Sequence, residues 1–376
     1  MTAFADRRIL DLFGIELPIL QAPMAGFSTP AMAVAVSEAG GLGGLACAQL
    51  GPAQVRDALT EIREGTSAPI NVNFFCHPVP KADPVRAMQW RTALAPYYVE
   101  HGLDPEAKPP AGGRAPFDED FCAVVEEARP EVVSFHFGLP DAKLVARVKA
   151  AGCKVISSAT TVAEARWLEA RGCDAIIAMG LEAGGHRGVF LFEGDDPAAA
   201  IPTQVGLFAL LPQVADAVSV PVIAAGGIAD ARGIVAAMTL GASAVQLGTA
   251  YLFSPEANVR PAHLAALQVA ADDSTAVTNV FTGRPARGIA NRLVREVGPL
   301  SPLAPAFPMA APAVIPLKGV GTADFLDMWS GQAAALCRPE PAGRLTARLA
   351  AEAATLISAP PGECRDPDRM APPSVR

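Results

Sequence analysis

The chain has few charged residues and no run of basic ones. Only 18% of its 376 residues are Asp, Glu, Lys or Arg, and the formal net charge at pH 7 is −8. Proteins that bind a nucleic acid backbone carry clustered Lys and Arg, so the sequence excludes that class. Hydrophobic residues make up 51% of the chain, which is enough for a large core and unlike the composition of a disordered protein.

Cysteine and histidine pairs at metal-binding spacing are also missing. The seven cysteines are odd in number, and no two of them form a Cys-x-x-Cys motif. A disulfide framework and a zinc ribbon are therefore disfavoured, and we expect a reducing, cytoplasmic location. The five histidines show no His-x-x-x-His spacing, so we expect no metal site.

Long hydrophobic stretches are absent as well. No window of 18 residues is continuously apolar, and the N-terminal stretch MTAFADRRILDLFG lacks the apolar core of a signal peptide. These features predict no membrane span and no export. Glycine (33) and proline (35) are frequent but lie in short clusters, which excludes collagen-like and low-complexity chains.

What is present is a series of short apolar runs with helical stretches between them. Most runs are continuous rather than alternating, which is typical of parallel strands covered on both faces. The predicted strands are Leu17–Leu20, Leu42–Ala46, Ile70–Phe75, Glu131–Phe137, Lys154–Ser158, Ala175–Met179, Val220–Ala225 and Ala244–Leu247. The predicted helices are Pro30–Ala39, Pro52–Glu64, Asp141–Ala150, Val162–Arg171, Gln204–Ala217 and Ala231–Leu240.

Eight strand–helix units in about 250 residues favour a TIM (β/α)₈ barrel over its rival, a doubly wound open sheet. We assign residues 1–255 to the barrel. Residues 77–130 form an insertion after the third strand, interpreted as a lid or a disordered excursion. Residues 256–376 form a C-terminal helical extension, expected to pack on the barrel mouth, with a frayed tail from about residue 360.

The loops after the last two predicted strands have the features of an anion-binding site. Gly226-Gly227 follows the seventh strand, and Asp230 is placed to cap the next helix. Gly248-Thr249 follows the eighth strand and offers a backbone donor and a hydroxyl. Two such loops beside a helix N-terminus are the usual phosphate site of this fold, so we expect a phosphate group there.

The rest of the predicted rim is poor in acid–base side chains. Lys and paired carboxylates, which aldolases and isomerases need, are missing from the strand ends, and Lys154 begins its strand at the wrong end. The Met24-Ala25 loop is apolar, and Asn73 can give a donor and an acceptor to a pyrimidine edge. These features favour a bound redox ring over a sugar-phosphate lyase or isomerase, which stays an alternative.

Several ordered motifs resemble the nitronate monooxygenase family, formerly called 2-nitropropane dioxygenase. They are QAPMAG-x-STP, AVSEAGGLG, HFGLP, EAGGHRG, AAGGI-x-D-x-RG, QLGTA and GRPARG-x-AN, and they cover about residues 15–295. A weaker similarity lies at Trp329–Gln332. HFGLP and EAGGHRG resemble the class I branch. Several motifs in one order are far more specific than any single glycine pattern.

The resemblance implies non-covalent FMN and oxidation of alkyl nitronates by O2 to a carbonyl product and nitrite, with propionate 3-nitronate as the typical substrate. By position, His186 matches the catalytic histidine of the family. The positions that match flavin contacts are Met24, Ala25, Asn73, Gly184, Gly185, Gly226, Gly227, Gln246, Gly248 and Thr249. The family often has Gln where this chain has Met179, so one hydrogen bond to the flavin is expected to be missing.

A nitronate is an anion and the protein is acidic, so the attraction must be local. We expect His186 to titrate near neutrality unless its surroundings shift it, to bond the nitronate oxygens, and to act as a base only for neutral nitroalkanes. Arg187 is the second candidate. The weaker candidates are Arg284, Arg287 and Lys318. His136 ends the fourth strand and stays open between a pocket residue and a core residue.

Two other functions remain open. An FMN-dependent enoyl reductase or NADH:quinone reductase on the same barrel is the nearest rival, because such barrels need no dinucleotide fingerprint. A flavin-binding protein without turnover is the other. The expected partners are a small-molecule nitronate and O2, with no nucleic acid and no membrane, in a monomer or a homodimer.

Overall fold

Eight parallel strands form one sheet. The computed structural model describes residues 4–108, 110 and 114–358. The strands are β1 (Ile19–Gln21), β2 (Gly43–Ala46), β3 (Ile70–Phe75), β4 (Val132–His136), β5 (Lys154–Ala159), β6 (Ala175–Met179), β8 (Val222–Ala225) and β9 (Ala244–Leu247). Their order is β1-β9-β8-β6-β5-β4-β3-β2, and a parallel bridge between Leu20 and Leu42 brings the two ends together. The sheet is a nearly closed barrel, which confirms the TIM-barrel prediction against the open-sheet rival.

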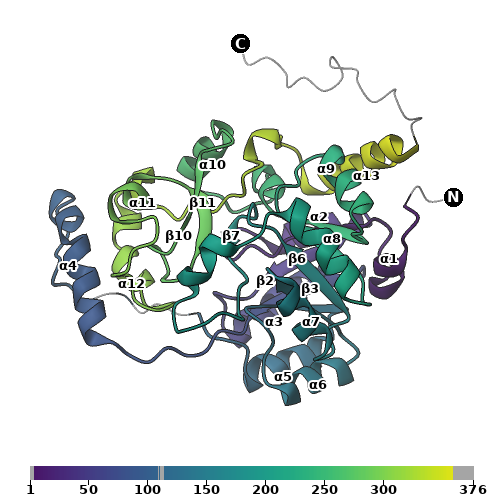
Figure 1. Ribbon diagram of the computed structural model, residues 1–376, viewed down its shortest axis with the longest axis horizontal. Coiled ribbons are helices and arrows are strands. Elements are labelled where there is room, and N and C mark those ends of the chain that lie inside the picture. The colour runs from purple at the N-terminus through teal and green to yellow at the C-terminus, as the bar shows by residue number, and fades with distance from the viewer. Residues whose placement is uncertain (1–3, 109, 111–113, 359–376) are drawn as a thin grey trace, which may run out of the picture.

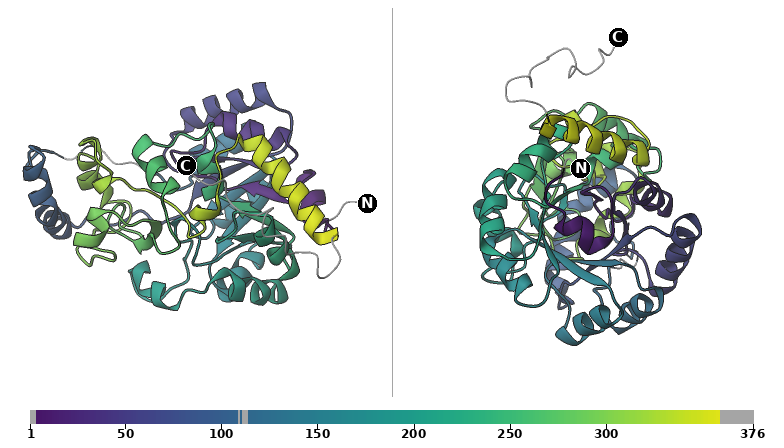
Figure 2. Two further views of the ribbon diagram at one scale, coloured as in Figure 1. Left: turned by 90° about the horizontal axis from the view of Figure 1, so that it is seen from above. Right: turned by 90° about the vertical axis from the view of Figure 1, so that its right-hand side faces the viewer.

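Helices surround this barrel as an outer ring, seen end-on in the right-hand view of Figure 2. They are α2 (Pro30–Glu38), α3 (Pro52–Gly65), α5 (Glu119–Ala128), α6 (Ala142–Ala150), α7 (Val162–Glu169), α8 (Leu207–Ala217) and α9 (Ala231–Thr239). Several begin at a polar cap, as the Asp141 and Asp230 side chains accept N–H groups of the first turn. Helix α13 (Ala342–Ser358) packs against α2 and α9, so the C-terminal extension completes the ring.

The described part of residues 77–130 contains two helices, which the expected lid or disordered excursion did not include. Helix α5 lies in this segment but is the barrel's own helix between β3 and β4, because it packs against α3 and α6. Helix α4 (Pro84–Glu100) stands outside the ring, against α12 (Ala311–Val314), as Figure 1 shows. Pro84 is in the first turn of α4, where proline is tolerated. The prolines of this segment therefore did not exclude a helix, which was not predicted from the sequence.

The amino ends of the strands are closed by α1 (Arg8–Phe13). Its side chains Ile9, Leu10 and Phe13 share one buried apolar cluster with Ile156 and Ile223 of the barrel. In the right-hand view of Figure 2, α1 is the purple helix that lies across the middle of the ring. This end of the barrel is therefore plugged by hydrocarbon.

The carboxyl ends of the strands are covered by a small antiparallel sheet. It joins β10 (Thr275–Thr278), β11 (Ala286–Ile289) and β7 (Gly185–His186), in the order β10-β11-β7 (Figure 1). The short helix η2 (Thr249–Phe253) follows β9 at the end of the barrel. The other helices of the extension are α10 (Pro261–Gln268), α11 (Arg292–Val297), η3 (Leu317–Gly319), η4 (Ala323–Phe325) and η5 (Ala334–Leu336). Because β7 belongs to the loop after β6, the sheet ties the extension to the barrel mouth.

No single helix in the described part of the chain is long and apolar enough to cross a membrane. The short helix η1 (Pro197–Thr203) and α8 meet the length and composition criteria only as a pair, and they bend by 99° where they join. The tail that we expect to be frayed from about residue 360 lies outside the described residues.

Candidate active site

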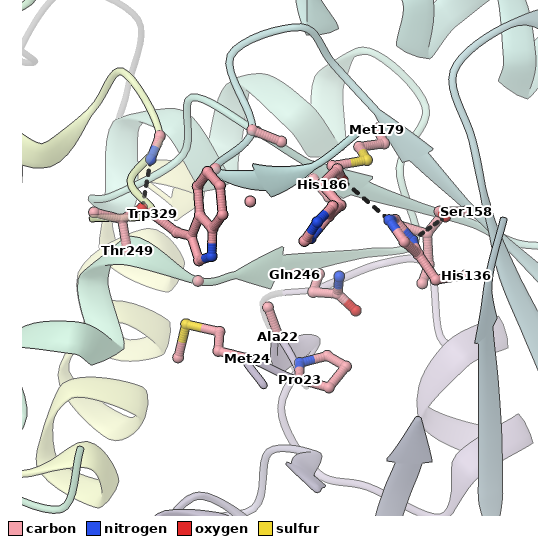
Figure 3. A pocket seen from close by; sticks show the side chains of 18 of the residues that line it. Ala22, Pro23, Met24, His136, Ser158, Met179, His186, Gln246, Thr249 and Trp329 are labelled. Carbon is pink, nitrogen blue, oxygen red and sulfur yellow. Dashed lines mark hydrogen bonds between the residues drawn. The ribbon is translucent and has the colours of Figure 1, made fainter. Parts of the chain in front are cut away.

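A cavity opens at the carboxyl ends of the barrel strands (Figure 3). Its walls come from the loops that follow the strands and from the stretch around Trp329 in the extension. It is lined by every position that we matched to a flavin contact, namely Met24, Ala25, Asn73, Gly184, Gly185, Gly226, Gly227, Gln246, Gly248 and Thr249. His136 and His186 line the same cavity. The fold thus brings together residues from all along the chain.

The loops after β8 and β9 form one corner of the cavity. Gly226 and Gly227 have φ angles of 113° and 70°, which favour glycine, and they lead towards the N-terminus of α9. Thr249 begins η2 in the other loop. Backbone N–H groups at such a corner can approach an anion closely, as the phosphate prediction requires.

The C-terminal extension packs against this corner of the cavity. Gly331 donates its N–H to Thr249 Oγ1 at 2.9 Å, and a Cβ atom on Gly184 would lie only 2.6 Å from the Gly331 nitrogen. Only glycine at position 184 permits this close approach. The Trp329–Gln332 similarity therefore marks a third loop of the cavity, which the strand pattern alone did not place.

A flat apolar wall faces a few polar atoms. Ala22, Pro23 and Met24 lie on one side in Figure 3. Gln246 Oε1 is buried without a hydrogen-bond partner in the part of the chain that the structure describes. Asn73 differs from expectation, because its amide nitrogen already donates to the backbone oxygen and Oγ of Ser134, and only its acceptor is left. Unpaired polar atoms beside an apolar slot fit the edge of a heteroaromatic ring.

His186 lies in this cavity on strand β7. It pairs with Ala286 of β11, so the small sheet fixes its backbone. Its Nε2 lies 2.9 Å from Thr282 Oγ1, and the residue is 8% exposed. Aromatic rings surround the imidazole, with ring centroids between 5.3 and 6.1 Å away, and these belong to Phe75, Phe137, Phe307 and Trp329. The imidazole is therefore held in a largely apolar enclosure.

The surroundings of His186 lower its pKa well below the ordinary value of 6.5. Burial is the main cause, and the positive charge of Arg114 is the next. The expected titration near neutrality is therefore shifted, and the imidazole is neutral at pH 7. A neutral imidazole carries one N–H donor and one lone pair.

His136 contacts the backbone of His186. Its Nε2 lies 3.0 Å from the His186 carbonyl oxygen and its Nδ1 lies 2.7 Å from Ser158 Oγ, as the dashed lines in Figure 3 show. A carbonyl only accepts, so Nε2 carries the proton and Nδ1 accepts from the Ser158 hydroxyl. Burial lowers the pKa of His136 to about 3. His136 lines the cavity, yet both of its ring nitrogens are used within the protein.

Two of the predicted substrate contacts do not reach the cavity. Arg187 is fully buried and donates to the carbonyls of Met179 and Gly180, at 3.1 and 2.7 Å. Lys318 forms an ion pair with Asp327 at 2.8 Å. In this structure both cations are engaged by protein acceptors, which a cation next to a glycine-rich loop can satisfy as readily as a ligand.

The weaker candidates are also engaged within the protein. Arg287 donates to the Leu181 carbonyl oxygen at 2.9 Å. The Arg284 guanidinium donates to the Val189 carbonyl and lies 3.9 Å from the centre of the Phe137 ring. Neither side chain lines the cavity.

Arg114 is a cavity residue that the sequence reasoning missed. It lies in the stretch PEAKPPAGGRAPFDED, which looks like solvated chain because it mixes charges with proline and glycine. Met179 does line the cavity, with a thioether where the resemblance led us to expect an amide. The described residues contain no group of three His, Cys, Asp or Glu side chains that could hold a metal ion.

The barrel, with a buried histidine in a cavity at the carboxyl ends of its strands, has the architecture of a TIM-barrel enzyme. A family model described as nitronate monooxygenase matches residues 6–352. The chain therefore belongs to the nitronate monooxygenase family, a family of oxidoreductases. Proteins named nitronate monooxygenase from Pseudomonas aeruginosa and Paraburkholderia phytofirmans are each 43% identical to it, over 92% of this chain and 98% and 94% of their own lengths.

Solved structures agree with this assignment. A nitroalkane oxidase from Streptomyces ansochromogenes is 39% identical, with a TM-score of 0.83 over 93% of this chain and all of its own. FabK from Thermotoga maritima is 31% identical, with a TM-score of 0.70 over 93% of this chain and 96% of its own. The fold is thus shared with proteins that carry different names.

Proposed function

We propose that the protein is an FMN-dependent nitronate monooxygenase that oxidises alkyl nitronates of the propionate 3-nitronate type with O2, giving a carbonyl product and nitrite. The observation that carries the proposal is the placement of His186, which faces the glycine corner and the apolar wall across a single cavity. The family membership supports the same reaction.

The lining of the cavity fits FMN in three respects. The glycine corner around Gly226, Gly227 and Thr249 would hold the phosphate, and the Ala22–Met24 wall would lie against the ring. The unpaired Gln246 Oε1 would accept from an N–H of the ring system. When bound, FMN supplies the redox centre that takes electrons from the nitronate and passes them to O2.

His186 would bind and orient the nitronate. Thr282 can donate its hydroxyl proton to Nε2, which leaves the N–H on Nδ1, and Nδ1 has no partner among the described residues. That tautomer gives the nitronate oxygens a donor. The opposite tautomer leaves the lone pair on Nδ1, which suits removal of a proton from a neutral nitroalkane. The aromatic rings around the imidazole exclude water and strengthen either contact.

A spectrum of the purified protein tests the cofactor, and nitrite release tests the reaction. We expect flavin absorption near ~450 nm, and nitrite together with O2 consumption when propionate 3-nitronate is added in air. A colourless protein that does not bind added FMN would overturn the cofactor assignment. A yellow protein that releases no nitrite from any nitronate would overturn the reaction.

The reductase stays a second candidate because of the similarity to FabK. Mixing with NADH or NADPH without O2 separates the two functions. Bleaching of the flavin within seconds would favour the reductase, whereas bleaching only on addition of a nitronate supports the proposed reaction.

A further inference from the structure

The cavity contains one basic side chain that the proposed function does not use. Within residues 4–108, 110 and 114–358, Arg114 is the only Lys or Arg that lines the cavity. Its side chain makes no hydrogen bond among the described residues. Burial lowers the pKa of Arg114 and the negative charge of Asp327 acts in the opposite direction, but Asp327 already forms an ion pair with Lys318 at 2.8 Å. A guanidinium with five donors therefore faces a cavity without a protein acceptor among the described residues.

The other cations near the cavity are different. Arg187, Arg284 and Arg287 donate to backbone carbonyls of the loops that build the site, so their role is to hold those loops. Such guanidinium groups gain little from a ligand, since binding it would require breaking contacts already made. Arg114 makes no such hydrogen bonds among the described residues, so it can bind a ligand without breaking any.

Arg114 and His186 lie on the same aromatic ring. The Arg114 guanidinium carbon is 5.8 Å from the centre of the Phe307 ring, and the His186 ring is 5.3 Å from that centre. Arg114 is also the charge that lowers the pKa of His186 most. Both groups thus lie near one ring in one cavity, the arrangement that a ligand with an anionic centre at each end of a short carbon chain would need.

We propose that Arg114 determines substrate specificity by binding a carboxylate at the end of the substrate remote from the nitronate carbon. The inference rests on the proposed function and deepens it. His186 holds the nitronate oxygens, and the planar guanidinium pairs with the planar carboxylate through two N–H groups. The net charge of −8 gives a dianion no general attraction, so this local cation supplies it.

The test compares two nitronates on the FMN-loaded, full-length protein. Propionate 3-nitronate carries the carboxylate, and propyl-1-nitronate has the same chain length without it. In Arg114→Met we expect KM for propionate 3-nitronate to rise about 10- to 100-fold, the range of one charge-assisted pair, with little change in kcat. KM for propyl-1-nitronate should stay within about threefold. Arg114→Lys should recover part of the loss, since it restores charge but not the two-pronged geometry.

A ligand that needs no turnover gives a second measurement. Succinate places two planar anions a short chain apart, and its dissociation constant can be measured by calorimetry on the flavin-loaded protein. We expect Arg114→Met to weaken succinate at least tenfold and to leave the flavin spectrum unchanged.

The outcomes separate the two hypotheses. If wild-type protein oxidises neither nitronate, the proposed function fails, while succinate binding still tests Arg114. Equal losses for both nitronates in Arg114→Met would mean that Arg114 serves the nitronate group or the position of His186. That result, or unchanged KM and unchanged succinate binding, would overturn the inference.

Discussion

The two ends of the barrel are built from opposite kinds of side chain. At the amino ends, α1 plugs the barrel with Ile9, Leu10 and Phe13, which pack with apolar side chains of the strands. At the carboxyl ends, the half-buried His136 and the buried His186 lie among loops rich in glycine. Burial of hydrocarbon stabilises the fold, whereas burial of imidazoles costs stability unless their nitrogens are paired. Stability and chemistry are therefore separable at opposite ends of one barrel.

The largest expected effect is at the plugged end. Phe13 is 3% exposed, and Phe13→Ala should lower the free energy of unfolding by about 3–5 kcal/mol, because the cavity left behind cannot be refilled. Urea denaturation at 25 °C measures this change. The kcat/KM of the folded protein for a nitronate should stay within about twofold, since the substitution is at the far end from the mouth. A matching loss of kcat/KM would show that the two ends are coupled.

The mouth should behave in the opposite way. His186→Asn should lower kcat/KM for propionate 3-nitronate by about 10²- to 10³-fold, the usual loss when one charge-stabilising donor is removed. The variant should keep its flavin spectrum, and its free energy of unfolding should fall less than in Phe13→Ala, because Asn fills part of the volume and can still pair with the Thr282 hydroxyl. Unchanged kcat/KM would remove His186 from the mechanism.

The buried histidines should also make stability depend on pH. Burial lowers the pKa of His263 and His77 to about 4, from an ordinary 6.5. Below pH 6.5 the unfolded chain takes up a proton at each site and the folded protein does not. The free energy of unfolding therefore falls as the pH drops from 6.5 to 4, by about 1.4 kcal/mol per pH unit for each histidine.

His263→Gln isolates one of these contributions. His263 is 2% exposed and does not line the cavity. The slope of unfolding free energy against pH, measured by urea denaturation between pH 4 and 6.5, should decrease by about 1.4 kcal/mol per pH unit. Parallel slopes in the variant and the wild type would contradict the neutral, buried state of this side chain, whatever the overall stability of the variant.

The sequence was most informative where structure is local. The continuous apolar run Ala175–Met179 coincides with β6, and the Ile70–Phe75 stretch, which includes Asn71 and Asn73, coincides with β3. The glycine corner could also be predicted, since Gly226-Gly227 and Gly248-Thr249 each directly follow a strand. In a parallel barrel the carboxyl ends of neighbouring strands meet, so chain order alone brings these loops together.

The contacts between distant segments could not be predicted. Strand β7 is only two residues long, and it exists because β11, about a hundred residues later, pairs with it. No periodicity can be read from two residues. Arg114 was missed for a related reason, because its stretch has the composition of a solvated loop and only the folded mouth shows that the side chain reaches the cavity.

The smallest predicted effect tests how the mouth holds His186. Ser158→Ala removes the hydroxyl that donates to Nδ1 of His136, whose Nε2 in turn donates to the His186 carbonyl oxygen. A net loss of about 1 kcal/mol corresponds to about fivefold in kcat/KM for a nitronate. Ser157→Ala is the matched control, because the neighbouring hydroxyl donates to the Phe135 and Gly138 carbonyls and does not touch His136. The control should lose similar stability and keep its kcat/KM. Equal losses of kcat/KM in the two variants would show that the strand as a whole, and not the His136 contact, positions the imidazole of His186.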